Sequence, residues 1–324
     1  MKRILVTAAS SLIGNGIVRS LRKSADKNFL IGSVIDEDTI ASAFCDLVVL
    51  APRSDDPTYM DWLLAEIKSR QISVLFAGIS DDHNLWNDHR SDLQRAGVTV
   101  VLNDQRLISL CQDKWQFYRE IKDITDCAIP SSLDNDYDHL VKSFGLPFLL
   151  KPRRGHGSKG IVRIESYEEF VPLQSQMGGV LMAQPIVGLD DQEYTVSVFG
   201  DGQGGYCGLM SLRRRLSKDG FTAKAEVVDD DEFLPSIIQL CRHFKPIGPT
   251  NFQFRLEASG PRLLEINPRI SSATSIRTAF GYNESLMALD YFCHGILPSQ
   301  PLIRRGKAIR FTEDFIFYET GHNL

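Results

Sequence analysis

The chain has 324 residues, and its 36 Lys and Arg against 41 Asp and Glu give a net charge of −5. This mild acidity argues against a nucleic-acid-binding protein, which usually presents a basic face, so we expect no nucleic-acid partner. The composition, 43% hydrophobic and 24% charged, is that of a globular protein, and the length suits two or three lobes.

The six cysteines are scattered without a C-x-x-C pair, which argues against structural zinc and favours reduced thiols. No apolar run approaches the length of a membrane span. The first three residues lead directly into an apolar strand, so they do not resemble a signal peptide. We therefore expect a cytoplasmic protein with no membrane partner.

Residues 1–110 alternate strand and helix patterns, which predicts a parallel sheet covered by helices. The turn after the first strand, residues 7–16, lacks the first two glycines of a dinucleotide-binding fingerprint, so we expect no NAD site there. This domain is expected to supply structure and one wall of a cleft. Residues 78–83 follow a strand at the edge where such sheets bind ligands, so they could line a pocket. The favoured interpretation is that they contain the capped start of a helix, at Ser80 or Asp81.

A cationic, glycine-rich loop follows the predicted strand 148–152, which carries Lys151 near its end. Residues 153–160 contain three glycines, a serine and several basic side chains, and strand 161–164 comes next. Backbone N–H groups of such a loop could fold over phosphates, and a simple hairpin turn is the alternative.

The stretch 180–188 is predicted to be a strand that runs into an apolar connector. Main-chain groups of such a connector can bind a purine base while aliphatic side chains enclose the ring. Asp190, Asp191 and Glu193 follow at once, and one of these acids is a candidate to accept hydrogen bonds from ribose hydroxyls.

Two strands, 251–257 and 263–267, are separated by a turn and are expected to pair as a hairpin. Alternation puts Leu264 and Ile266 on one side, and Glu265 and Asn267 on the other. Gln253 then falls close to Glu265 across the hairpin. Three oxygen ligands on one face suit Mg²⁺ or Mn²⁺, although a half-buried strand with solvated polar residues is the alternative.

Four features follow one another along the chain: the strand with its lysine, the glycine-rich hairpin, the connector with a downstream Glu, and the hairpin ending in Asn-Pro-Arg. In this order they resemble the ATP-grasp superfamily. In detail the chain is similar to one synthetase half of the carbamoyl-phosphate synthase large subunit, and the resemblance covers nearly the whole chain. It implies a fold of α/β and α+β type. Three parts are expected: a Rossmann-like pre-ATP-grasp domain (1–110), a small lobe with a glycine-rich lid (111–185), and a C-terminal lobe with the metal and nucleotide site (186–324).

The resemblance also implies roles for individual residues. The implied nucleotide-binding residues are Lys114, Lys151, Gly155, Gly157, Ser158, Gly160, Gln184, Pro185, Ile186 and Glu193. The implied metal ligands are Gln253, Glu265 and Asn267, and the implied catalytic residues are Arg269 and Lys151. The family often has Glu where this chain has Gln184, and many members have an acid where it has Gln253. The Asp190–Asp191 pair leaves open which acid binds the ribose.

The function implied by the resemblance is an ATP-dependent carboxylate–amine ligase. A substrate carboxylate would become an acyl phosphate, and an amine would displace the phosphate to give an amide, ADP and phosphate. The expected cofactors are ATP and Mg²⁺, with Mn²⁺ as a substitute, and the expected partners are a small-molecule carboxylate and amine. Phosphoryl transfer of the carbamoyl-phosphate type is an alternative, as is a non-catalytic ATP-binding regulatory protein.

Two further segments carry open alternatives. The basic stretch Arg213–Arg215, with Lys224 beyond the next turn, suits either an anionic substrate or a solvated hairpin. The aromatic segment Ala308–Tyr318 is predicted to be a strand that contacts another lobe or a second chain in a homodimer.

Overall fold

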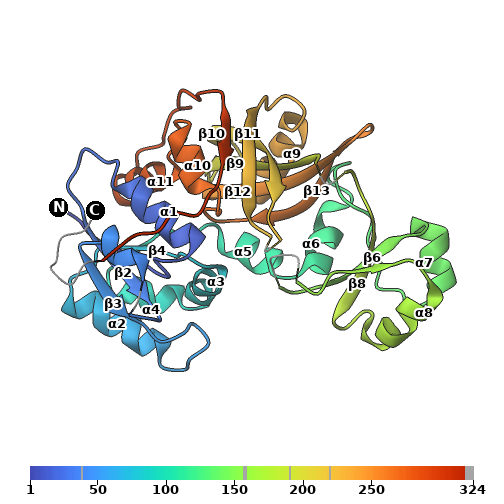
Figure 1. Cartoon of the computed structure of the whole chain (residues 1–324), viewed down its shortest axis with the longest axis horizontal. Coiled ribbons are helices and arrows are strands. Elements are labelled where there is room, and N and C mark those ends of the chain that lie inside the picture. The colour runs from blue at the N-terminus through green and yellow to red at the C-terminus, as the bar shows by residue number, and fades with distance from the viewer. Residues whose placement is uncertain (38, 156–158, 190, 219, 318–324) are drawn as a thin grey trace.

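The computed structural model describes residues 1–37, 39–155, 159–189, 191–218 and 220–317. It is elongated, with a large antiparallel sheet between an N-terminal α/β domain at one end and a small lobe at the other (Figure 1). None of the helices in the described ranges combines the length and the apolar composition needed to cross a membrane.

The N-terminal domain is built on a five-stranded parallel sheet in the order β3-β2-β1-β4-β5, which confirms the predicted Rossmann-like fold. Its strands are β1 (Arg3–Val6), β2 (Phe29–Val34), β3 (Leu47–Leu50), β4 (Val74–Phe76) and β5 (Thr99–Val100). Its helical segments are α1 (Leu12–Leu21), η1 (Ile40–Ala43), α2 (Tyr59–Ser69), α3 (Ser80–Asp88), α4 (Arg90–Arg95) and α5 (Gln105–Cys111). Helix α3 begins at Ser80 as expected, but the preceding Ile79 provides no side-chain cap.

Two glycines allow α1 and the turn after β4 to approach β1 closely. A Cβ atom at Gly14 would lie 2.2 Å from the carbonyl oxygen of Ala8, and one at Gly78 would lie 1.9 Å from that of Thr7. Only glycine fits such contacts with backbone. They bring the N-termini of α1 and α3 together at the carboxyl edge of the sheet, which faces the rest of the chain.

The small lobe has a three-stranded sheet in the order β7-β6-β8. The strands are β6 (Phe148–Pro152), β7 (Val162–Ile164) and β8 (Leu181–Pro185), and the helical segments are α7 (Tyr137–Phe144), α8 (Tyr167–Phe170) and η2 (Val171–Gln176). Phe148, Leu150 and Phe170 form the centre of its own small core. Both β6 pairings are antiparallel, so the glycine-rich loop connects two neighbouring strands, as predicted.

The large sheet has six antiparallel strands in the order β13-β12-β9-β10-β11-β14. Its strands are β9 (Glu193–Asp201), β10 (Tyr206–Leu216), β11 (Thr222–Val228), β12 (Ile247–Glu257), β13 (Gly260–Asn267) and β14 (Lys307–Ile309). The associated helices are α6 (Lys114–Ile121), α9 (Leu234–Phe244), α10 (Thr274–Ala279) and α11 (Glu284–His294).

The pairing of β12 with β13 confirms the predicted hairpin. Gln253 lies opposite Glu265, and Asn251 lies opposite Asn267. The prediction of strict alternation along β13 is wrong at Leu264. The register shifts after Gln253, so Phe254 pairs with Leu263 and Leu264 has no partner residue on β12. Leu263 and Ile266 are the buried residues of β13, and Leu264 lines the cavity beside Glu265. A β-bulge of this kind adds one residue to one strand and turns its side chain to the other face.

The large sheet packs on both neighbours through shared cores. Phe117 from α6 and Ile237 from α9 pack with Phe252 and Phe254 of β12 in one cluster. A second cluster joins Ile17 and other residues of the N-terminal domain to residues of β9 and α11. The N-terminal domain is therefore packed firmly against the large sheet, which fixes the position of its carboxyl edge relative to β12 and β13.

The strand predicted for the aromatic segment extends only over β14, so the prediction is wrong from Arg310 to Phe317, and Tyr318 lies outside the described residues. β14 pairs with β11 over three residue pairs only. Phe311 is 78% exposed, whereas Phe315 lies 6.3 Å from Phe44 between ring centroids. Aromatic alternation predicted a strand, but within the described residues the pairing ends at Ile309, apart from one hydrogen bond from Arg310 N to Ala223 O of β11 at 2.9 Å.

Replacing Phe254 by alanine removes a fully buried ring beneath the hairpin. We expect the free energy of unfolding to fall by about 3–5 kcal/mol, because the cavity left in a packed core cannot fully collapse. Chemical denaturation monitored by circular dichroism measures this. Phe311→Ala, at an exposed position, is the matched control and should change stability by less than about 0.5 kcal/mol. Equal effects of the two substitutions would contradict the core assignment.

Candidate active site

A cavity of about 590 Å³ lies where the small lobe, the large sheet and the N-terminal domain meet. Many residues predicted from the sequence line it together: Lys114, Lys151, Gly155, Pro185, Ile186, Glu193, Gln253, Glu265, Asn267 and Arg269. Gln184 and Gly160 are not among the lining residues, and Gly157 and Ser158 lie outside the described residues. Residues that are more than 150 positions apart in the chain thus share one cavity.

The oxygen-bearing side chains of the hairpin face this cavity as a group. Asn267 Nδ2 donates a hydrogen bond to Glu265 Oε1 at 2.8 Å, and Gln253 Oε1 accepts one from Arg214 Nη2 at 2.5 Å. Carboxylate and amide oxygens are the ligands that Mg²⁺ prefers, and Mg²⁺ in nucleotide sites uses one or two carboxylates together with phosphates. The donor set therefore fits a magnesium ion that phosphate oxygens also bind.

Arg269 connects this group to the N-terminal domain. Its Nε donates to Ser80 Oγ at 3.0 Å, and its Nη2 donates to Asn267 Oδ1 at 3.3 Å. Ser80 is the first residue of α3, so the arginine lies between Asn267 on the hairpin and the N-terminus of this helix. A planar guanidinium in this position is suited to a phosphate or carboxylate group.

The two predicted lysines lie at the entrance to the glycine-rich loop. Lys114 Nζ donates to the carbonyl oxygens of Pro152 at 3.3 Å and Gly155 at 2.7 Å, which ties the start of α6 to the start of the loop. Desolvation in the cleft lowers the pKa of Lys151 to about 8, although the negative charge of Glu265 partly opposes this effect. Lys151 is therefore a cation whose charge is easily lost near neutral pH.

The connector after β8 supplies an apolar wall. Pro185 and Ile186 line the cavity together with Leu149 and the bulged Leu264. The side chain of Gln184 points elsewhere, since its Nε2 donates to Ser131 Oγ at 2.7 Å and the residue is buried. Any contribution of Gln184 to ligand binding in the cavity would therefore come from its main chain.

Glu193 differs from the two aspartates considered beside it. Its carboxylate is buried, and it forms ion pairs with Arg214 at 2.8 Å and with Arg255 at 3.4 Å. Asp191 is exposed and does not line the cavity, and Asp190 lies outside the described residues. Of the two described acids, Glu193 is the one in position to contact a ligand.

Residues 180–313 match the family model described as "ATP-grasp in the biosynthetic pathway with Ter operon". The match includes the connector, Glu193, and the hairpin with its oxygen ligands. Over this stretch the chain is similar to the ATP-grasp family.

The chain is also similar to the carbamoyl phosphate synthase large chain of Methanothrix thermoacetophila, with 22% identity over 264 residues, and to that of Methanosarcina mazei, with 21% over 266 residues. These matches cover 72% of this chain but 24% of each relative, so the chain spans about a quarter of their length.

Solved structures show the same fold across nearly the whole chain. Biotin carboxylase from Campylobacter jejuni, in complex with β,γ-ATP, gives a TM-score of 0.77 at 15% identity, over 94% of this chain and 74% of that one. N5-carboxyaminoimidazole synthetase from Staphylococcus aureus, complexed with ADP, gives 0.71 at 16% identity, over 93% and 80%.

Two arginines of this site were not predicted to lie there. Arg214 was considered only within a basic stretch, and alternation along β10 turns it into the cavity, whereas Arg213 and Arg215 are exposed. Arg255 was not singled out from its strand, yet it lines the cavity beside Gln253. Period-two spacing from Gln253 was the signal that could have found it.

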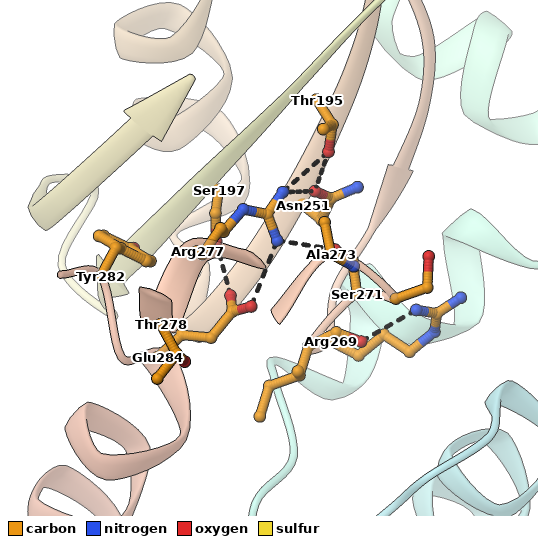
Figure 2. A network of polar contacts seen from close by, with 12 residues as sticks. Thr195, Ser197, Asn251, Arg269, Ser271, Ala273, Arg277, Thr278, Tyr282 and Glu284 are labelled. Carbon is orange, nitrogen blue, oxygen red and sulfur yellow. Dashed lines mark hydrogen bonds and ion pairs between the residues drawn. The ribbon is translucent and has the colours of Figure 1, made fainter. Parts of the chain in front are cut away.

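Beneath the hairpin, a buried ion pair between Arg277 and Glu284 supports the ATP-grasp site (Figure 2). Both side chains are 0% exposed, and Arg277 Nη1 lies 3.2 Å from Glu284 Oε1. Arg277 Nη2 donates to Asn251 Oδ1 at 2.6 Å and to Thr195 Oγ1 at 2.8 Å. Because Asn251 faces Asn267 across the strands, the ion pair fixes the end of the hairpin from below.

The same network reaches the segment that follows Arg269. Arg277 Nη1 donates to Ser271 Oγ at 2.7 Å, and Glu284 Oε2 accepts from Ser197 Oγ at 2.6 Å. The sequence offered one signal for this network. Arg277 is the only charged residue between positions 270 and 283, within a stretch that is otherwise apolar or neutral.

Glu284→Gln neutralises one partner of this pair and leaves Arg277 as a buried cation. We expect it to lower the free energy of unfolding by about 3–5 kcal/mol, because a buried charge without its counter-ion retains its desolvation cost. Urea denaturation measures the loss. The control is Asp229→Asn, which breaks the exposed pair with Arg305 and should cost at most about 1 kcal/mol. A small effect of Glu284→Gln would contradict the supporting role.

Proposed function

We propose that this ATP-grasp protein is an ATP-dependent carboxylate–amine ligase that forms an amide bond through an acyl phosphate and releases ADP and phosphate. One observation carries the proposal: cations, oxygen ligands and an apolar slot line a single cavity, although they come from three parts of the chain. A cationic, an acidic or an apolar surface is common on its own, but all three together in one cavity suit a nucleotide with its metal ion.

The proposed nucleotide position follows from the chemistry of the walls. The base would lie against Pro185, Ile186 and Leu264, and the phosphates would lie near Lys114 and Lys151. Glu193 would accept from the ribose, and its pairing with two arginines holds its carboxylate in place. Gly157 and Ser158 belong to the proposed phosphate loop by their place in the sequence.

Gln253, Glu265 and Asn267 would bind Mg²⁺, or Mn²⁺ in its place. The metal would neutralise charge on the β- and γ-phosphates during transfer. With one carboxylate among three ligands, the chain itself provides little charge, and groups of three or more His, Cys, Asp or Glu side chains suited to a metal are absent from the described residues. The metal would therefore bind mainly together with the nucleotide.

In the proposed reaction, a carboxylate oxygen of the substrate attacks the γ-phosphorus, and the bond from that phosphorus to the β–γ bridging oxygen breaks to release ADP. The amine nitrogen then attacks the acyl carbon, the phosphate leaves with its bonding electron pair, and the nitrogen loses a proton. Arg269, between Asn267 and Ser80, would stabilise negative charge on the phosphoryl group and on the tetrahedral intermediate. Lys151 would hold the phosphates in line.

ADP release tests this function. The chain with ATP and Mg²⁺ is incubated with pooled carboxylic acids, pooled amines, or both, and products are identified by mass spectrometry. A ligase releases ADP stoichiometrically with an amide only when both pools are present. Release with carboxylic acids alone would support phosphoryl transfer of another kind, and nucleotide binding without release under any condition would support a regulatory protein.

Glu265→Ala should reduce ADP release by at least about a hundredfold, because losing the single carboxylate ligand removes several kcal/mol of charge stabilisation. A coupled ADP assay on purified protein measures it, and circular dichroism should show an unchanged fold. Glu257→Ala, on the neighbouring strand and outside the cavity, is the control and should retain activity. Full turnover by Glu265→Ala would refute the metal assignment.

The affinity for ATP should weaken as the pH rises above about 8. Lys151 has a pKa of about 8 in the free protein, so above this pH it must take up a proton to bind phosphate as a cation. The dissociation constant measured by calorimetry between pH 7 and 9.5 should rise by up to about tenfold per unit. Lys151→Arg keeps its charge throughout this range and should flatten the profile, whereas Lys224→Arg, an exposed control, should not.

A further inference from the structure

A second cavity, of about 220 Å³, lies at the carboxyl ends of β1 to β4 in the N-terminal domain. In open parallel sheets this edge is the usual place for ligands. The walls are mainly apolar and include Val34, Ile35, Ala51, Pro52 and Ile79. We call this cavity the edge pocket.

The floor of the edge pocket carries buried polar groups. Asp82 is 2% exposed and accepts a hydrogen bond from Ser54 Oγ. Tyr59 is also 2% exposed and lines the pocket, and its hydroxyl lies beside the Asp82 carboxylate and the Trp86 indole without a well-formed hydrogen bond to any described residue. A buried hydroxyl whose hydrogen bond is incomplete is costly unless a ligand or water completes it. Such a group in a pocket wall therefore points to a ligand.

The charge of the edge pocket selects the kind of ligand. Three aspartates line it, Asp55, Asp81 and Asp82, against one arginine, Arg53, which is already paired with Asp55 at 3.2 Å. Burial raises the pKa of Asp82, so the exposed Asp81 is the acid available to a cation. This balance disfavours carboxylates and phosphates and favours a cation. An apolar wall with acidic groups suits a primary amine attached to a compact apolar body.

The edge pocket adjoins the ATP-grasp cavity. Ile79 and Asp81 line both cavities, and Ser80, between them in sequence, accepts the hydrogen bond from Arg269. A molecule in the edge pocket thus has one end beside Asp81, on the side where Arg269 would hold the reacting phosphoryl group. Its nitrogen would therefore lie where the two cavities meet.

We propose that the edge pocket binds the amine substrate, a primary amine with a compact apolar body, and that Asp81 holds its nitrogen at the junction with the active cavity. This inference rests on the proposed ligase function, because the amine is the second substrate of that reaction. The apolar walls hold the body, and the Asp82–Tyr59 floor accommodates any further polar group on it.

The test uses three probes that share a phenethyl group, phenethylamine, 2-phenylethanol and 3-phenylpropanoate, and measures their binding to the full chain by calorimetry at pH 7.5. We expect phenethylamine to bind most tightly and 3-phenylpropanoate least. Ala51→Phe fills the pocket and should weaken phenethylamine at least tenfold. Leu50→Phe is the matched control, because it adds the same ring at the neighbouring exposed position outside the pocket and should change binding less than twofold.

Asp81→Asn is a second variant at an exposed position, so it should fold even if Ala51→Phe does not, and it should weaken phenethylamine about three- to tenfold. The proposal is overturned if no probe binds the wild type, if 3-phenylpropanoate binds as tightly as phenethylamine, or if both variants leave amine affinity unchanged. Binding of MgATP to the wild-type chain is measured separately. Amine binding without ATP binding would refute the ligase function, whereas ATP binding without amine binding would refute only the edge pocket.

Discussion

The arrangement of the site depends on the antiparallel pairing of β12 with β13. That register places Gln253 opposite Glu265, and one bulged residue turns Leu264 toward the cavity while Leu263 and Ile266 stay in the core. Oxygen-bearing side chains and an apolar residue that lines the cavity thereby lie side by side on the hairpin. The buried Arg277 stabilises this register from beneath, because it donates a hydrogen bond to Asn251 of β12.

Several charged side chains of the cavity are held by partners within the protein. Glu193 pairs with Arg214 and Arg255, and Lys114 donates to carbonyl oxygens at the start of the glycine-rich loop. Burial makes the charged form of Lys151 less favourable: desolvation lowers its pKa to about 8, even with Glu265 nearby. Lys114, Arg214 and Arg255 are therefore held by existing partners before any anion binds, which reduces the reorganisation that binding requires.

Much of this could be predicted from the sequence, because hydrophobic periodicity and local motifs determine strands, helices and which residues share a face. The parallel sheet, the hairpin and the pairing of Gln253 with Glu265 were predicted correctly. The bulge at Leu264 and the short β14 were not, because both depend on the partner strand rather than on local pattern. The Arg277 network joins residues that are distant in sequence, and no local pattern shows which buried groups will meet.

The hydrogen bond from Arg269 to Ser80 joins two parts of the molecule that carry different walls of the site. Ser80 begins α3, whose first turn also lines the edge pocket, so a small displacement of that helix would move the arginine relative to Asn267. The N-terminal domain is firmly packed on the large sheet, which restricts such displacement to local adjustment. The hydrogen bond between Arg269 and Ser80 is therefore the contact through which a change in the wall shared by the two cavities would reach Asn267.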